Sequence, residues 1–273
     1  MHVHAHPLDV VVAVGLALGA GLYGIGAGRA GRRALPWPRR LAFTVGWTTL
    51  GVAVLSPIDR LAASLFWAHM VQHQLLMVVA APLLVVSRPL TAMLRALPGR
   101  ARQAATRWRR VAGAPWRELT RPSTGALAFA LALWGWHVPA LYEAALRSDV
   151  VHAAEHASFL GAGALFWWTV IRRRTDAGLA AICLFVTAAH TGVLGGLLTL
   201  APTVWYPGQS VGAAGLASIE DQQLAGLVMW VPSGVAFVGA ALVVLARWLA
   251  EAERRVSLSA SERLARAAGR RTS

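Results

Sequence analysis

Long apolar runs alternate with short polar stretches along the whole chain. Seven of these runs are close to 20 residues, the length that a helix needs to cross the hydrocarbon core of a bilayer. They occupy about 8–28, 41–56, 64–87, 123–141, 150–171, 178–200 and 222–247. Runs of this length with so few charges are typical of transmembrane helices. The pattern therefore predicts an all-α, polytopic membrane bundle with seven transmembrane helices.

The composition agrees with a membrane protein and excludes other classes. Hydrophobic residues make up 56% of the 273 residues and charged residues only 14%, against roughly 25% charged residues in soluble proteins. A chain this apolar is neither a soluble domain nor a disordered one. Cys183 is the single cysteine, which excludes a disulfide framework and a thiolate-rich metal site. No long linker divides the chain, so we expect one membrane domain over 1–273, with a basic tail at 251–273.

The arginines predict how the helices are oriented. All 26 basic residues are arginine, and the segments that would share one side of the membrane carry 24 of them. The other side carries only Arg60 and Arg147. Because arginine collects on the cytoplasmic side of membrane proteins, we expect the N-terminus outside and the C-terminus in the cytoplasm.

The net charge of +14 therefore follows from topology. The segment 88–122 mixes nine arginines with Trp108 and Trp116, as expected of an interfacial segment that lies on anionic lipid. Since these arginines stand between apolar runs, we expect membrane lipid, and no nucleic acid, as their partner.

All nine histidines fall on the opposite, arginine-poor side. Six of them lie in the outer halves of the predicted helices: His69, His73, His137, His152, His156 and His190. The other three, His2, His4 and His6, lie in the N-terminal tail, where they either capture metal ions or belong to a solvated tail. Polar groups inside a bilayer are costly and usually mark function.

Two histidine pairs have the spacing of a helical metal site. His69 and His73 are four residues apart, as are His152 and His156, so each pair shares one helix face. Imidazole suits copper, zinc and iron, and thioether selects Cu(I). We expect the two pairs to be primary metal ligands, with His137 and His190 completing the site or supporting it. Glu155 would orient an imidazole, and Met77 or Met229 would offer a soft ligand.

Each of these residues also has a purely structural interpretation. A lone histidine such as His190 commonly forms a hydrogen bond between helices, and methionines commonly pack in the apolar core.

Seven of the twelve acidic residues lie on the outer side: Asp9, Asp59, Glu143, Asp149, Glu155, Glu220 and Asp221. A net-negative outer face attracts cations. The sequence has no Walker loop, GxSxG or HExxH motif, so we do not expect an enzyme.

Several segments together resemble one protein family. They are SPIDRLA (Ser56–Ala62), FWAHMVQHQLLMVVAAPLLVVSRP (Phe66–Pro89), WHVPALYEAAL (Trp136–Leu146), VHAAEHASFLGAGALFWW (Val151–Trp168), APTVWYP (Ala201–Pro207) and EDQQLAGLVMWVP (Glu220–Pro232). In this order they are similar to the CtaG family, the caa3-type cytochrome c oxidase assembly factors of bacteria.

The resemblance implies a bacterial plasma-membrane protein that helps an aerobic oxidase mature at its copper centres, with oxidase subunits as partners. The positions that match are His69, His73, His137, His152, Glu155 and His156, together with Trp205, Tyr206, Glu220, Asp221 and Gln222. The leading hypothesis is therefore a copper-binding assembly factor with its site on the extracytoplasmic side. The alternatives are a haem-binding or haem-handling protein, a metal or proton transporter, and a cofactor-free membrane chaperone.

Overall fold

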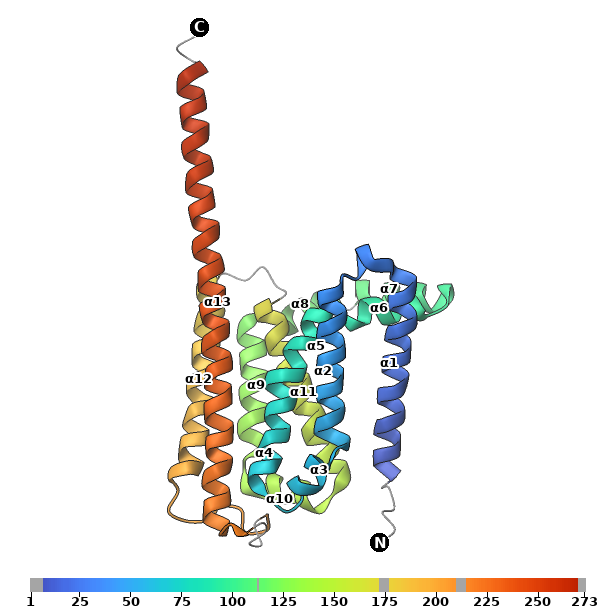
Figure 1. The fold of residues 1–273 in the computed structure, drawn as a ribbon, viewed down its shortest axis with the longest axis vertical. Coiled ribbons are helices and arrows are strands. Elements are labelled where there is room, and N and C mark those ends of the chain that lie inside the picture. The colour runs from blue at the N-terminus through green and yellow to red at the C-terminus, as the bar shows by residue number, and fades with distance from the viewer. Residues whose placement is uncertain (1–6, 112, 172–176, 210–214, 270–273) are drawn as a thin grey trace.

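The computed structural model describes residues 7–111, 113–171, 177–209 and 215–269, and its regular elements there are all helical (Figure 1). The all-α prediction is therefore confirmed. The N-terminal histidines His2, His4 and His6 lie outside the described residues, as do Arg172, Arg173 and Arg174.

The helices follow one another in this order along the chain. They are α1 (Pro7–Ala34), α2 (Trp37–Leu55), α3 (Pro57–Ala62), α4 (Phe66–Gln74), the π-helix η1 (Leu75–Ala80), α5 (Ala81–Ser87), α6 (Pro89–Ala96), α7 (Gly99–Val111), α8 (Gly113–Leu119), α9 (Pro122–Trp136), α10 (Pro139–Arg147), α11 (Asp149–Ile171), α12 (Ala177–Leu200) and α13 (Ser218–Gly269).

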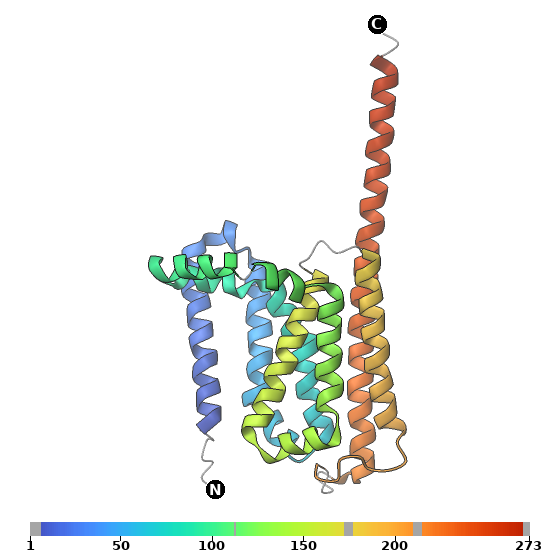
Figure 2. The same cartoon turned by 180° about the vertical axis from the view of Figure 1, so that it is seen from behind.

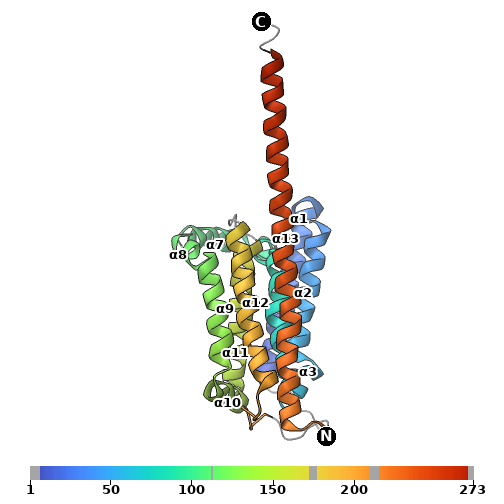
Figure 3. The same ribbon diagram turned by 90° about the vertical axis from the view of Figure 1, so that its left-hand side faces the viewer.

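The long helices form a bundle with two distinct ends. The short helices α3 and α10 lie at one end, and α6, α7 and α8 lie across the other (Figures 1 and 3). The pair α12 and α13 forms one flank and α1 forms the opposite flank (Figure 2). The described chain begins at the α3/α10 end, and α13 projects far beyond the other end (Figure 1). The arginine-rich helix α7 and the basic tail therefore share one end of the bundle.

Four helical stretches are long and apolar enough to cross a membrane. They are Leu8–Gly31, Phe66–Ser87, Ala177–Leu200 and Ser218–Arg255, and α9 with α10 makes a fifth if this bent pair is one span. Helix α2 is too polar by this measure because it begins with Arg39 and Arg40, and α11 because it carries two histidines and Glu155. Seven spans therefore remain a prediction.

Two predicted spans differ in outline from the helices observed. The run 123–141 does not form one straight helix: α9 ends at Trp136, and α10 begins at Pro139 with a bend of 73°. Proline lacks an N–H and disfavours helical backbone in the residue before it, so Pro139 starts a new helix. The run 222–247, in contrast, belongs to a continuous helix of 52 residues that passes through Pro232 and includes much of the basic tail.

Helix α11 packs closely against the π-helix η1, which follows α4 directly. Gly163 of α11 has no side chain to hold the backbone of Met77 away. The Trp167 indole N–H donates a hydrogen bond of 2.9 Å to the Met77 carbonyl oxygen, an acceptor in the π-helix that precedes Pro82. These contacts fix the two helices that carry the histidine pairs.

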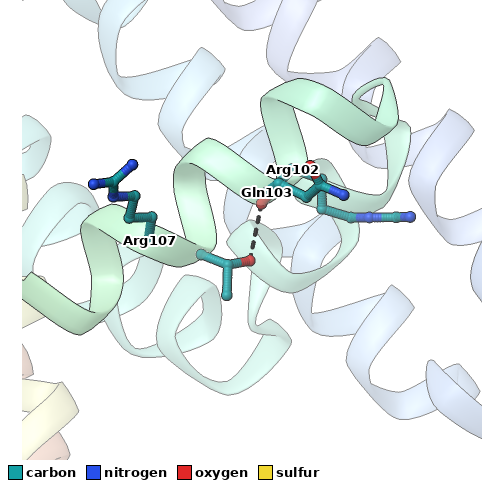
Figure 4. A pocket seen from close by; sticks show the side chains of 4 residues that line it. Arg102, Gln103 and Arg107 are labelled. Carbon is teal, nitrogen blue, oxygen red and sulfur yellow. Dashed lines mark hydrogen bonds between the residues drawn. The ribbon is translucent and has the colours of Figure 1, made fainter.

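The arginine-rich end is built from exposed side chains. A shallow depression of about 460 Å³ lies on α7 and is lined by Arg102, Gln103, Thr106 and Arg107, whose side chains are drawn in Figure 4. The Thr106 hydroxyl donates a hydrogen bond of 2.8 Å to the Arg102 carbonyl oxygen. The Arg102 and Arg107 side chains extend to different sides of the helix (Figure 4), consistent with an interfacial helix between lipid headgroups and water.

Candidate metal centre

The first half of the site comes from α4. His69 and His73 lie on one face of this helix and are 1% and 2% exposed. The start of α4 is fixed by Asp221 of α13, whose two carboxylate oxygens accept hydrogen bonds of 2.9 Å from the Phe66 and Trp67 N–H groups. A carboxylate at a helix N-terminus satisfies unpaired N–H groups and complements the helix dipole. Asp221 therefore positions the histidine pair from a distant part of the chain.

The second half comes from α11. Glu155 is 0% exposed, and its carboxylate lies between the α4 imidazoles. The carboxylate oxygens are 3.6 Å from Nε2 of His69 and 3.5 Å from Nε2 of His73. In the described part of the chain these three residues form the one set whose ligand atoms all lie within 4.8 Å of one another. The donor set is thus two imidazoles and a carboxylate, all buried.

Three more imidazoles surround this set. The His152 ring is 5.3 Å from the His69 ring and 4.2 Å from the His156 ring. The His156 ring is 5.8 Å from the His73 ring, and the His137 ring is 6.2 Å from it. The five imidazoles and the Glu155 carboxylate are called the histidine cluster below. The structure thus brings both pairs and His137 close together, and their role as metal ligands stays a prediction.

Most polar atoms of the histidine cluster are buried without a hydrogen-bond partner among the described residues. They are Nε2 of His69, His137, His152 and His156, both ring nitrogens of His73, and both carboxylate oxygens of Glu155. Burying polar groups without partners is costly, and native proteins keep few such groups. An arrangement with this many in one place points to a ligand that accepts their lone pairs.

His137 shows how one imidazole is prepared for that role. Its Nδ1–H donates a hydrogen bond of 2.6 Å to the Leu133 carbonyl oxygen, so that Nε2 of a neutral ring carries the free lone pair. Backbone carbonyls commonly orient metal-binding histidines in this way. His137 is the C-cap residue of α9, and the break before α10 places its ring beside His73.

The donor set fits a metal ion of the imidazole-preferring class. Metal–nitrogen distances of about 2.0–2.1 Å place two ligands of one ion at most about 4 Å apart. Because the ligand atoms of His69, His73 and Glu155 lie within 4.8 Å of one another, rotamer shifts of about 1 Å would bring them onto one ion. The remaining imidazoles leave a choice of further ligands.

An aromatic cap covers the histidine cluster at the α3/α10 end. It consists of Phe66, Tyr142 and Tyr206, which are at most 1% exposed and whose rings lie 4.5–5.3 Å apart. The Tyr142 ring is 5.2 Å from the His69 ring. The Tyr206 hydroxyl donates a hydrogen bond of 2.6 Å to the His137 carbonyl oxygen. Burial raises the pKa of the Tyr206 hydroxyl, so it remains a donor in alkaline solution.

Gln209 fastens the aromatic cap. The Tyr142 hydroxyl donates to Gln209 Oε1 at 2.8 Å, and Gln209 Nε2 donates to the Ala62 carbonyl oxygen at 2.5 Å. Gln72, which lies between the α4 histidines, similarly donates to the Ala53 carbonyl oxygen and to Asp59. Gln72, Tyr142 and Gln209 were not predicted as site residues from the sequence. Gln72 had a usable signal, because a polar side chain inside an apolar run is rarely accidental.

A second aromatic group lies further along the bundle. Phe129, Phe166, Trp167 and Phe237 pack with ring centroids 5.3–5.8 Å apart, and they are called the aromatic floor. Phe166 lies two helical turns from Phe159, which contacts His73 at 4.3 Å between ring centroids. His190 belongs to this region, since its ring is 6.2 Å from Phe129. The ring contacts that join the histidine cluster do not include His190, and its ligand role stays a prediction.

The predicted supporting residues have different surroundings. Met77 and Met229 are buried at 2% and 1% exposure, within the apolar core around the aromatic floor. The exposed Glu220 accepts a hydrogen bond of 2.9 Å from the Ala217 N–H at the start of α13. The Trp205 N–H donates to Gln222 Oε1 at 2.6 Å. Glu220, Asp221 and Gln222 therefore hold the connection to α13 in place, and Asp221 reaches the site through α4.

Comparison with known proteins gives one match. A family model described as cytochrome c oxidase caa3 assembly factor matches residues 21–251. This range includes every member of the histidine cluster. Neither the curated proteins nor the solved structures contain a match.

Proposed function

Because the chain belongs to the family of cytochrome c oxidase caa3 assembly factors, we propose that it binds copper in the histidine cluster and delivers this copper to the oxidase. One observation carries the proposal: a carboxylate and four imidazoles are buried beside the partly exposed His152, and most of their lone pairs have no hydrogen-bond partner among the described residues. Imidazole suits copper, and copper binds such sites most tightly among the divalent first-row metals.

Delivery requires a site that releases its ion. His69, His73 and Glu155 form the core of the cluster, and His152 and His156 add imidazoles within one ring contact of it. More donors are present than one ion uses, so an incoming ligand can replace one imidazole while the others hold the ion. Glu155 supplies a negative charge that offsets the charge of the cation in a buried place.

We further propose that the histidine cluster lies on the extracytoplasmic side of a bacterial plasma membrane. The cluster lies beside α10, because the rings of His69 and Tyr142 are 5.2 Å apart, whereas α7 and the projecting part of α13 lie at the other end of the bundle (Figure 1). Arginine-rich segments favour the cytoplasmic side. In this topology α2, the bent pair α9–α10 and α11 complete seven spans, with the N-terminus outside and the C-terminus in the cytoplasm.

The geometry favours a site for a single metal ion over a haem site. It also favours copper delivery over transport of an ion across the membrane. The rings of His69 and His152 are stacked at 5.3 Å with an angle of 27°, which leaves no space for a macrocycle between them. A transporter needs ligands that continue through the bundle, but the aromatic floor follows the cluster. A cofactor-free chaperone would not need buried imidazoles without partners.

Copper content tests the proposal directly. The purified protein, loaded with Cu(I) and freed of excess metal, should hold about one copper ion per chain, and the double variant His69→Ala/His73→Ala should hold almost none. His190→Ala is the matched control, because it removes an imidazole outside the cluster and should keep the copper. A thermal unfolding curve of each variant shows that the loss is not misfolding. Equal copper in the wild type and the double variant would overturn the proposal, and a Soret band would favour haem.

A further inference from the structure

A groove opens on the flank of the bundle between α1, α2 and α11. It encloses about 450 Å³. Leu8, Val12 and Leu16 of α1 form one wall, and Trp47 and Val54 of α2 form another. The polar residues that line it are Asp9, Asp59, Asp149, His152 and His156. An otherwise apolar groove thus ends on two members of the histidine cluster.

The α3/α10 end of the bundle, unlike the groove, gives no open path to the histidine cluster. At the α3/α10 end the aromatic cap covers the imidazoles, and Tyr142 and Tyr206 are 0% and 1% exposed. Hydrogen bonds to Gln209 and to the His137 carbonyl oxygen hold these two rings in place. A cation that arrived from this end would have to break the cap. The flank offers a route that leaves the cap intact.

His156 connects the groove to the buried donors. Its side chain lines the groove, yet it is only 8% exposed and its Nε2 has no hydrogen-bond partner among the described residues. The neighbouring His152 also lines the groove and stacks on His69. Ring-to-ring steps of 4.2, 5.3 and 5.8 Å therefore lead from these two imidazoles to His69 and His73.

Three carboxylates give the groove a negative charge. Asp59 is held in position by Gln72 Nε2, which donates a hydrogen bond of 2.8 Å to it, and Asp9 and Asp149 lie in the first turns of α1 and α11. The groove lining contains no arginine. Charges of one sign along a cleft with apolar walls focus the field and raise the local concentration of counter-ions. The walls between these carboxylates are apolar, so we expect the groove to concentrate cations in this way.

Helix α1 forms a wall that is fastened mainly away from the groove. Arg29 Nη1 donates to the carbonyl oxygens of Arg95 and Ala96 at 3.1 and 2.6 Å, and Tyr23 stacks on Phe43 at 3.5 Å. Within the groove region, the Trp47 indole N–H donates to the Leu16 carbonyl oxygen at 3.1 Å. The residues before Leu16 therefore line the groove beyond the last of these fastenings.

We infer that this groove is the route by which a monovalent or divalent metal cation enters and leaves the histidine cluster. Asp9, Asp59 and Asp149 attract the cation, and His152 and His156 are the first imidazoles that it meets. The inference rests on the proposed function, because it assigns the path to the same copper site. It adds three carboxylates, Asp9, Asp59 and Asp149, whose effect is on the rate of copper exchange and not on the equilibrium copper content.

A removable block tests the route. Ala153→Cys places a thiol in the groove, and Ala154→Cys places one on the adjacent exposed position outside the lining. Both are made in a Cys183→Ser background, so that the introduced thiol is the only one. Each protein is treated with a bulky disulfide-forming thiol reagent, and loading is followed by stopped flow after mixing with Cu⁺ supplied as its acetonitrile complex. Modification should abolish the fast loading phase for Ala153→Cys and leave it intact for Ala154→Cys, and reduction should restore it.

Variants that remove charged side chains test separately whether the groove carboxylates attract the cation. Asp9→Asn/Asp149→Asn should slow loading about tenfold at low ionic strength, with less effect at high salt, because steering by fixed charges is screened. Glu118→Gln/Glu143→Gln removes the same charge from residues outside the groove lining and should load at the wild-type rate. Equilibrium copper content should be unchanged in both double variants.

The outcomes separate the two proposals. If the wild type takes up no copper, the proposed function fails and the route fails with it. If the wild type loads normally but modification of the thiol from Ala153→Cys leaves the loading rate unchanged, the groove is not the route, while the copper site stands. Equal slowing by both charge variants would show that overall charge, and not the groove carboxylates, governs loading.

Discussion

The two ends of the bundle treat polar side chains in opposite ways. At the α7 end the ion pair of Arg121 with Glu118 is exposed, at 58% and 62% of the side-chain surface, so water or headgroups solvate both charges. At the α3/α10 end Glu155 and its histidines are almost entirely buried. Because the first ion pair is exposed, it contributes little to the free energy of unfolding, and other residues could replace it. Burial makes the second costly, and a protein keeps such a cost where the groups serve a function.

The largest expected effect follows from removing the buried charge. Glu155→Leu should lower copper affinity about 100-fold, and it should raise the unfolding free energy of the copper-free protein by about 1–3 kcal/mol, because an unpartnered buried carboxylate is replaced by an apolar group. Metal titration and thermal unfolding measure the two effects. Glu118→Leu, at the exposed end, should change neither. A copper-free Glu155→Leu protein less stable than the wild type would mean that Glu155 has a structural role.

The next effect concerns the residue that fixes α4. Asp221→Ala removes two charge-assisted hydrogen bonds to the Phe66 and Trp67 N–H groups and should lower the unfolding free energy by about 2 kcal/mol. Copper affinity should also fall, because Asp221 fixes the first turn of α4 and this turn leads directly to His69. Ser56→Ala is the control: it removes one neutral N-cap bond, to the Ile58 N–H, and should cost about 1 kcal/mol without altering copper affinity.

A smaller effect is expected at the aromatic cap. Tyr206→Phe removes the hydrogen bond to the His137 carbonyl oxygen and should cost about 1 kcal/mol at neutral pH. Because burial raises the pKa of Tyr206 above its ordinary value of 10.0, the folded protein retains a proton that the unfolded chain loses. Wild-type stability should therefore fall as the pH rises above 10, by up to about 1.4 kcal/mol per unit from this group. Tyr206→Phe should show a correspondingly shallower slope in pH-dependent unfolding.

The smallest effect is expected at the exposed end. Arg102→Ala/Arg107→Ala should leave copper content unchanged and should shift the unfolding free energy by less than about 0.5 kcal/mol in neutral detergent. In vesicles that contain anionic lipid, the same variant should lose about 1 kcal/mol of lipid interaction per arginine. Unfolding measured in neutral and anionic vesicles separates these contributions. A large loss of copper here would remove the contrast between the two ends.

The histidine spacing made much of the site predictable. Four-residue intervals in 64–87 and 150–171 require each pair to share a helix face, and alternation of the apolar runs places both pairs at similar depth. Periodicity within one helix carries no information on which helices are neighbours. The contact of Glu155 with both α4 imidazoles and the reach of Asp221 to Phe66 therefore emerged only from the fold.

The helix boundaries predicted from the sequence differ from the observed boundaries at two prolines. Pro139 divides the apolar run 123–141, and the resulting turn brings His137 toward His73. Conversely, Pro232 does not end α13, because packing in a bundle tolerates a proline that an isolated helix would not. Tyr142 and Gln209 had no periodic signal, since they act through contacts with residues far away in the sequence, including the hydrogen bond between them.

The aromatic floor has an electrical consequence. A charge that crosses a membrane does work against the transmembrane voltage, about 2.3 kcal/mol per elementary charge for each 100 mV. A cation that enters the histidine cluster by the groove and leaves the same way stays on one side of the floor and crosses little of that voltage. Loading and release in sealed vesicles should therefore be insensitive to an imposed membrane potential. The protein would then supply metal equally to an energised and a de-energised cell.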